Sequence, residues 1–205
     1  SQVKTIGENA FASCQALAEV TFAENSQLIS IGQSAFKGVT ALTSISIPPY
    51  VTSIGENAFQ GATYLTEVIF EANSQLTSIE SGAFQGSTRL TEITIPESVV
   101  SIGSSAFSYM LELTSVTFAG DSELTIMNYA LFSDSQKMTN ITIPKSVTSI
   151  GSYAFQGATR LTEFTVDDNN YNYKDIDGVL FDKSGENLIA YPGGNTRSSY
   201  TIPET

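Results

Sequence analysis

Apolar residues return along this chain at a fixed long interval, and phenylalanine marks that interval most clearly. Seven phenylalanines, usually preceded by alanine, share the pattern: Phe11, Phe36, Phe59, Phe84, Phe107, Phe132 and Phe155. Successive members lie alternately 25 and 23 residues apart. A repeat of roughly 20 to 29 residues is typical of a solenoid, in which each repeat forms one coil stacked on the previous coil. The pattern therefore predicts an elongated stack.

Five further apolar columns accompany the phenylalanines. They lie eight and five residues before each phenylalanine, and six, nine and eleven residues after it. In the coil around Phe59 these positions hold Val51, Ile54, Leu65, Val68 and Phe70. Because the columns recur with almost no polar intrusion, we expect them to form one continuous core.

The last three columns predict a short β-strand in every coil. Their spacing, as in Leu42-Thr-Ser-Ile45-Ser-Ile47, is Leu-x-x-Ile-x-Ile, which is typical of leucine-rich repeats. Apolar and polar residues alternate over Ile45–Ile47, which indicates a strand with one buried and one exposed face. We expect the strands of successive coils to pair in parallel, about 4.8 Å apart.

The segment around each phenylalanine is expected to form the opposite side of the coil. It is too short for a long helix, so we expect one helical or 3-10 turn, as over Ser34–Gly38. Glycine two residues after the phenylalanine would cap that turn, at Gly38, Gly61, Gly86 and Gly157. Another glycine, four residues before it, is expected to take a positive φ at Gly7, Gly32, Gly55, Gly103 and Gly151.

The repeats pair into a unit of 48 residues, because coils that end in Ile-Pro alternate with coils that end in Phe. Pro48, Pro96 and Pro144 follow every second predicted strand, where the missing N–H donor stops the strand ladder. The predicted fold is an α/β repeat solenoid. It is a right-handed superhelix with short parallel strands on one face and helical turns and loops on the other.

We interpret residues 1–205 as a single domain of about eight coils. Residues 167–205 break the repeat and are expected to form a modified coil with a hairpin around Asp182–Asn187. The sequence begins and ends within a repeat, and we therefore expect it to be cut at both ends from a longer array.

Composition and charge limit which ligands the protein can bind. The net charge is −12, with 21 acidic against 9 basic residues, and this argues against nucleic acids and anionic lipids as ligands. No apolar run approaches the ~18 residues that a membrane span requires, so direct insertion into a membrane is not expected. We expect a monomer.

The chain lacks the residues on which much catalysis depends. It contains no histidine, which removes Ser-His and Cys-His nucleophile pairs and the commonest zinc ligand. The single cysteine, Cys14, excludes an intrachain disulfide, and we expect it to be a packed core thiol rather than a nucleophile. No phosphate-binding glycine loop is present. We therefore predict that the protein is not an enzyme, with neither a cofactor nor a metal.

The repeat resembles a known family. Ile93–Phe107 and Ile141–Phe155 share the motif Ile-Thr-Ile-Pro-x-Ser-Val-x-Ser-Ile-Gly-x-x-Ala-Phe, which resembles the BspA-like, or type 5, leucine-rich repeats. Asp177-Gly-Val-Leu-Phe181 and Leu188-Ile-Ala-Tyr-Pro192 look like a recurrent variant of that repeat. The resemblance spans essentially the whole chain. It implies an extracellular or cell-surface protein, and for many members an adhesin that recognises host proteins.

The outward residues of the predicted strands are the candidate binding surface for an extracellular protein or glycan. These residues are Glu19, Ser44, Glu67, Glu92, Thr94, Ser115, Thr117, Asn140, Thr142 and Glu163. One alternative is a passive spacer within a larger surface protein. Another is a glycan hydrolase that uses Glu67 and Glu92, whose carboxylates would lie roughly 5 Å apart on neighbouring coils.

Two further patterns suggest other ligands. Threonines repeat ten residues after the phenylalanines, as in an ice-binding ladder, but the charged column beside them disfavours that function. The acidic run Asp167–Asp177 raises the possibility of a calcium site, but Tyr173 occupies the position where an EF-hand needs glycine. Turns rich in Asp and Asn account for the same composition.

Overall fold

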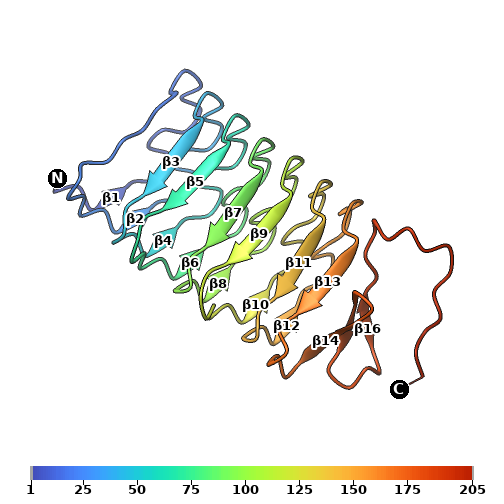
Figure 1. Ribbon diagram of the computed structural model, residues 1–205. Helices are drawn as coiled ribbons and strands as arrows, with labels where there is room; N and C mark the ends of the chain where they lie inside the picture. The colour runs from blue at the N-terminus through green and yellow to red at the C-terminus, as the bar shows by residue number, and fades with distance from the viewer. Residues whose placement is uncertain (1, 205) are drawn as a thin grey trace.

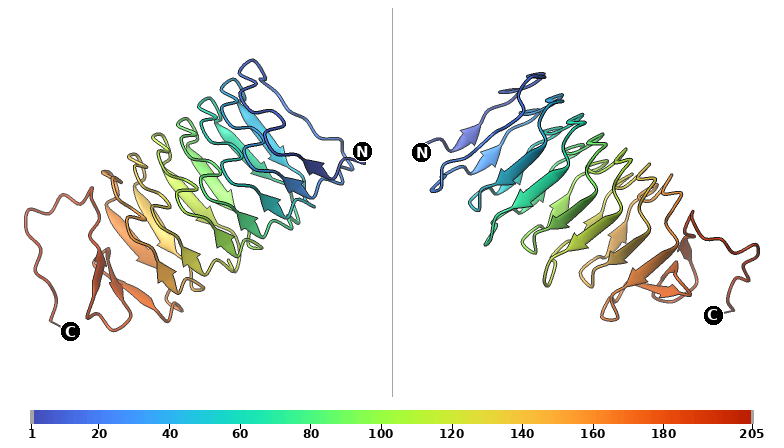
Figure 2. Two further views of the ribbon diagram at one scale, coloured as in Figure 1. Left: turned by 180° about the vertical axis from the view of Figure 1, so that it is seen from behind. Right: turned by 45° about the horizontal axis from the view of Figure 1, so that its top comes forward.

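A computed structural model describes residues 2–204. The coils stack side by side into an elongated body with the N-terminus at one end and the C-terminus at the other (Figures 1 and 2). The body is a parallel β-solenoid of about seven turns, whereas we expected about eight coils. The stacked solenoid that the phenylalanine repeat predicts is confirmed.

One side of the body carries a continuous parallel sheet that the sequence analysis did not anticipate. Its seven strands have two residues each, and neighbours in the order given are hydrogen-bonded: β1 (Thr5–Ile6), β2 (Ser30–Ile31), β4 (Ser53–Ile54), β6 (Ser78–Ile79), β8 (Ser101–Ile102), β10 (Ile126–Met127) and β12 (Ser149–Ile150). Ile31 pairs with Ile54, and Ile54 with Ile79. The sheet therefore forms where the isoleucine column before each phenylalanine lies.

The predicted four-residue strands are present from the second coil onward. They are β3 (Ser44–Ile47), β5 (Glu67–Phe70), β7 (Glu92–Ile95), β9 (Ser115–Phe118), β11 (Asn140–Ile143) and β13 (Glu163–Val166). They pair as β3–β5, β7–β9 and β11–β13, so the expected parallel pairing is present within these pairs but not between every two successive coils (Figure 1). The residues Glu19–Phe22 of the first coil form no strand.

Proline explains where these ladders stop. Within a pair, the residue after the second strand donates to the last residue of the first, as from the Glu71 amide to the Ile47 carbonyl at 3.1 Å. The equivalent donor facing Phe70 would be Pro96, which has no N–H. Pro144 has the same effect at the other break, between β9 and β11, and Pro48 lies at the equivalent position after β3, facing the first coil. The prediction that proline stops the ladder is therefore confirmed.

The phenylalanines stack as one continuous column through the core. Adjacent rings from Phe11 to Phe155 lie 5.0–6.2 Å apart between centroids and are tilted by only 4–14°. The five rings from Phe36 to Phe132 are completely buried. The expectation that this column belongs to one continuous core is confirmed.

The predicted helical turn is wrong, because no residue among 2–204 is helical. Around Phe59, the alternate residues Asn57 and Gly61 take φ values of 55° and 71°. The amides of Asn57, Phe59 and Gly61 consequently point the same way and donate to the next coil, at 2.7–2.9 Å. The turn is therefore a second place where neighbouring coils are hydrogen-bonded. The four predicted C-cap glycines do have positive φ, but they end no helix.

The glycines four residues before each phenylalanine do not take a positive φ, so that prediction is also wrong. From the second coil onward, they lie where adjacent backbones nearly touch. A Cβ atom on Gly103 would come within 2.3 Å of the Ser81 nitrogen, and one on Gly55 within 2.6 Å of the Gln33 nitrogen. Glycine is required here for close approach rather than for turning.

Cys14 is exposed, in contrast to the packed thiol that we expected. The equivalent positions Val39, Ala62, Ser87 and Met110 are fully buried. Cys14 lies in the first coil, which has a neighbouring coil on one side only (Figure 1). The missing neighbour accounts for its exposure.

The C-terminal part contains the expected hairpin as part of a three-stranded antiparallel sheet. The strands are β14 (Tyr173–Ile176), β15 (Val179–Asp182) and β16 (Leu188–Ala190), with β15 in the middle. Leu180 of β15 belongs to the solenoid core. The small sheet therefore covers one end of the apolar stack (Figure 2).

Candidate functional site: the strand-lined face

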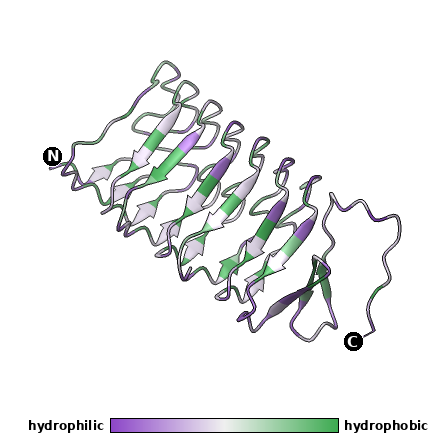
Figure 3. Cartoon of the chain, in the orientation of Figure 1, coloured by the Kyte–Doolittle hydropathy of each residue, from purple (hydrophilic) through white to green (hydrophobic). Residues whose placement is uncertain are grey.

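The outward residues of β3, β5, β7, β9, β11 and β13 form what we call the strand-lined face. Along each strand, buried apolar residues alternate with exposed ones, which are mostly polar (Figure 3). Of the predicted surface residues, Ser115 is half-buried, and Glu19 is exposed but lies outside any strand. The others are exposed on the face: Ser44, Glu67, Glu92, Thr94, Thr117, Asn140, Thr142 and Glu163.

A groove of about 820 Å³ crosses this face over β5, β7 and β9. It brings together five of the predicted residues: Glu67, Glu92, Thr94, Ser115 and Thr117. The groove lies where the ladder between β5 and β7 is interrupted, and Pro96 is part of its lining. The same proline that stops the ladder thus helps to shape the groove.

The groove has a strongly acidic lining. Glu71 and Glu97 join Glu67 and Glu92, and no lysine or arginine lines it. Glu71 and Glu97 follow the strands at a corner, and the sequence analysis missed them because it considered only outward strand positions. Ile69, 45% exposed, adds an apolar side chain. The signal that could have found the acidic pair is their recurrence just after the strand.

A second hollow, of about 310 Å³, lies over β9 and β11 at the next break in the ladder. Ser115, Thr117, Asn140 and Thr142 line it, so this hollow shares two residues with the larger groove. Ser44, Glu163 and Glu19 line neither hollow. The structure thus groups seven of the ten predicted residues around two breaks.

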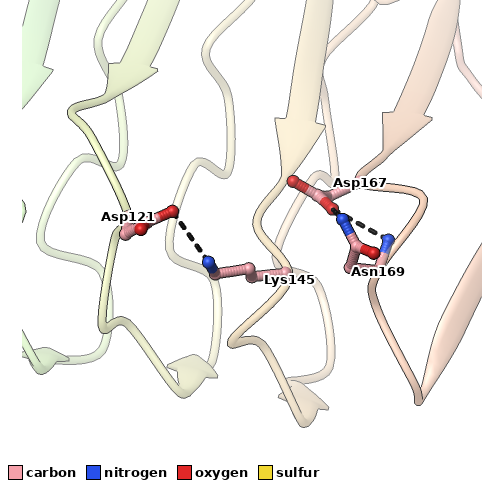
Figure 4. Close-up of polar contacts among 4 residues, drawn as sticks. All are labelled: Asp121, Lys145, Asp167 and Asn169. Carbon is pink, nitrogen blue, oxygen red and sulfur yellow. Dashed lines mark hydrogen bonds and ion pairs between the residues drawn. The ribbon is translucent and has the colours of Figure 1, made fainter.

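An ion pair spans two coils at the edge of the second hollow. The Lys145 ammonium donates to the Asp121 carboxylate at 2.7 Å, and the Asp167 carboxylate accepts from the Asn169 amide at 2.9 Å (Figure 4). The hydrogen bond and charge of Lys145 lower the pKa of Asp121, and Asp121 correspondingly raises the pKa of Lys145. This cation is therefore already paired with an acidic side chain.

Two basic side chains near the entrance to the strands also have partners. Arg89 lies 4.0 Å above the centre of the Tyr64 ring, and Lys137 forms an ion pair with Glu112 on the preceding coil. These contacts connect neighbouring coils and leave the carboxylates of the large groove as its dominant charges.

The acidic run Asp167–Asp177 is occupied by structural hydrogen bonds. The buried Asn170 side chain donates to the carbonyls of Pro144 and Val147, and its oxygen accepts from the amides of Asn172 and Tyr173. No group of three or more Asp, Glu, Cys or His side chains in residues 2–204 is arranged to hold a metal ion. The observed role of the run is therefore to join the last coil to the small sheet.

Glu67 and Glu92 both line the large groove. Our separation of roughly 5 Å assumed paired strands, whereas β5 and β7 belong to different ladders. Both side chains are exposed, while a carboxylic acid that donates a proton at neutral pH is held in an apolar environment. The arrangement is suited to binding positively charged and hydrogen-bonding groups.

The fold and the face define a leucine-rich repeat protein, a class that presents extended surfaces built from successive coils. The sequence matches the BspA type leucine rich repeat region in six copies, over residues 1–85 and 70–187. The chain therefore belongs to the BspA-type leucine-rich repeat family. A search among curated proteins found no match.

Solved structures of bacterial proteins share this fold. The pneumococcal vaccine antigen PcpA is 31% identical with a TM-score of 0.78, over 98% of this chain and 45% of that protein. A leucine-rich cell surface protein from Faecalibacterium prausnitzii is 31% identical with a TM-score of 0.67, over 91% and 56%. The chain thus spans about half the length of either relative. No helix in residues 2–204 could cross a membrane.

Proposed function

We propose that this chain is a cell-surface recognition module that binds an extracellular protein or glycan through the strand-lined face. The acidic groove over β5, β7 and β9 is the observation that carries the proposal, because it is the larger of the two hollows described on this face. Its partner would contribute basic and hydrogen-bonding groups. A surface location is supported by relatives described as a vaccine antigen and a cell surface protein.

The test is charge reversal within the groove. Binding would be screened against extracellular matrix proteins and glycans at low and moderate salt, and the best ligand measured against the double variant Glu67→Lys, Glu92→Lys. We expect affinity to fall about tenfold or more, and its salt dependence to weaken, because two attractive carboxylates become repulsive.

A matched control keeps the change in net charge but places it elsewhere. Glu8 and Glu186 are exposed and line neither hollow, so Glu8→Lys with Glu186→Lys should leave affinity nearly unchanged. Equal losses of affinity in both double variants would show that the effect comes from net charge rather than from the groove. Full binding by the groove variant would refute the site and favour the passive spacer.

Hydrolysis of a glycan is a second candidate, supported by the presence of Glu67 and Glu92 in one groove. It predicts release of sugar from a glycan that binds the chain, and loss of that release in Glu92→Gln. Binding without release would exclude hydrolysis and leave the recognition function intact.

A further inference from the structure

The two hollows of the strand-lined face each have an incompletely buried aromatic ring in their lining. The larger groove lies at the break between β5 and β7, and the smaller hollow at the break between β9 and β11. Phe70 lines the first and Phe118 the second, and both side chains are half-buried. At the same position of three other coils, Ile47, Ile95 and Ile143 are completely buried. The aromatic rings are therefore accessible only at the breaks.

The two hollows form one track along the axis of the solenoid, which we call the aromatic track. Ser115 and Thr117 of β9 line both hollows, and β5, β7, β9 and β11 follow one another along the body (Figure 1). Phe70 and Phe118 belong to coils that are separated by one other coil. The core phenylalanine rings of these three coils lie 5.1 and 5.5 Å apart. The two accessible rings therefore recur roughly 10 Å apart, about twice the spacing of neighbouring strands.

This spacing selects among the conformations of a partner segment. A polyproline II helix has three residues per turn, so residues three apart lie on the same side and about 9.3 Å from each other. A β-strand places residues on the same side about 6.6 Å apart. An α-helix brings one residue to the same side in every turn of about 5.4 Å, so it would also direct a side chain at the closed coil between the hollows. Only the polyproline II period matches the track.

The charge of the track differs between its two ends. Four glutamates and no basic residue line the larger groove, whereas in the smaller hollow the cation of Lys145 is paired with Asp121. A polysaccharide with one repeating unit would present the same groups to both hollows. A peptide can carry basic residues at one end only, and this matches the uneven charge. The observations therefore favour a peptide over a glycan.

Hydroxyl groups along the track suit the backbone of such a peptide. Thr94, Thr117 and Thr142 are exposed and line one or both hollows. A polyproline II segment forms no internal hydrogen bonds, so its carbonyls remain free to accept from these side chains.

We propose that the aromatic track binds a polyproline II segment of an extracellular partner protein, with two apolar residues three apart and basic residues at one end. The apolar residues contact Phe70 and Phe118, and the basic residues lie over the glutamates of the larger groove. Aromatic-lined grooves recognise this conformation because it is preformed and loses little entropy on binding. The proposal rests on the proposed function, since it identifies the partner of the same face.

The probe is the capped peptide Arg-Arg-Leu-Pro-Pro-Leu-Pro-Pro, in which the leucines are three apart and the prolines favour polyproline II. The reversed peptide, Pro-Pro-Leu-Pro-Pro-Leu-Arg-Arg, tests the opposite chain direction. In NMR titrations of the protein, we expect at least one of them to bind with a Kd below about 1 mM. Its leucine methyl groups should show nuclear Overhauser effects to the rings of Phe70 and Phe118.

Matched peptides test the spacing and the charge separately. Arg-Arg-Leu-Pro-Pro-Pro-Leu-Pro and its reversed form have the same composition but place the leucines four apart. They should bind at least about fivefold more weakly, because the second leucine is rotated away from the track. Replacing both arginines by glutamine in the better probe should also lower affinity and remove most of its salt dependence.

Variants of the protein locate the bound peptide. Thr117 is exposed and lines both hollows, whereas Thr165 occupies the equivalent outward position of β13 and lines neither. Thr117→Lys should weaken binding about fivefold or more, because it places a cation in the track. Thr165→Lys makes the same change in net charge and should leave affinity nearly unchanged.

The other outcomes overturn the proposal and show what becomes of the proposed function. Equal affinity for leucines three and four apart, still reduced in Thr117→Lys, would retain recognition through the face but exclude the polyproline II period. If no probe binds while a matrix protein or glycan loses affinity in Glu67→Lys with Glu92→Lys, the face recognises another ligand. Equal binding of the probe by Thr117→Lys and Thr165→Lys would place it outside the track. Full binding of the probe by the double glutamate variant would refute both proposals.

Discussion

At some positions in this protein, the space left by the next coil determines which residue can fit. The glycine four residues before each phenylalanine has an ordinary φ, and its missing side chain lets two backbones approach. Gly7 lies in the same column, but a Cβ atom there would meet nothing within 4 Å. The constraint therefore arises from stacking and is absent where one neighbour is missing.

This difference predicts opposite results for one substitution at two equivalent sites. Gly103→Ala should reduce the free energy of unfolding by about 1–3 kcal/mol, because the methyl group collides with backbone that cannot move aside. Gly7→Ala should be neutral or stabilise by up to about 1 kcal/mol, since alanine restricts the unfolded chain. Urea denaturation monitored by circular dichroism provides both values. Equal effects at the two positions would contradict the close-approach explanation.

At the scale of a single element, the turn between β15 and β16 is organised by one carboxylate. Asp182 accepts hydrogen bonds from the Asn187 side chain and from the amides of Gly185 and Asn187, and also from the Ser184 hydroxyl. These bonds, with the Asn187 side chain contributing most, lower the pKa of Asp182 from 3.8 to about 2. The ionised carboxylate of Asp182 thus stabilises the turn.

The lowered pKa of Asp182 predicts the pH at which the turn loses the stabilisation that this carboxylate provides. A carboxyl whose pKa is depressed in the folded state stabilises above its unfolded pKa, and the effect is lost as the pH falls through the folded pKa. The contribution should therefore be complete above about pH 4 and disappear towards pH 2. NMR titration of the Asp182 carboxyl carbon should give a midpoint near 2, and Asn187→Ala should raise it. A midpoint near 4 in the intact protein would show that these hydrogen bonds do not form in solution.

At the scale of the whole molecule, stability is shared along a one-dimensional array. Neighbouring coils are joined through the seven-stranded sheet, the hydrogen-bonded turns and the phenylalanine stack. In such an array, damage to a central coil weakens two interfaces, whereas damage to an end coil weakens one. Position in the stack should therefore decide the cost of a substitution.

Truncating equivalent phenylalanines tests this dependence on position. Phe84→Ala removes a completely buried ring from the middle of the stack and should cost about 3–5 kcal/mol. Phe11→Ala removes a half-buried ring from the first coil and should cost less than half as much. Tyr171→Ala, at an 85% exposed position, is the neutral control in the same urea experiment. Equal costs for the two phenylalanines would exclude a nearest-neighbour array.

Much of the candidate site could be read from periodicity, because outward strand positions follow directly from a period of two. Glu67, Glu92, Thr94 and Thr117 were placed correctly on that basis. Glu71 was missed because it lies at a corner, where no regular alternation indicates which way a side chain points.

The chain alone determined the stack of coils, the apolar columns and the positions at which proline interrupts the strands, because each depends on local spacing and on the chemistry of one residue type. Contacts between coils determined the remaining features of the structure. Whether the segment around each phenylalanine becomes a helical turn or a hydrogen-bonded edge depends on the carbonyls of the next coil, which lie 23 or 25 residues away. The groove likewise lies between two successive strands that do not pair, and its lining combines side chains from three coils.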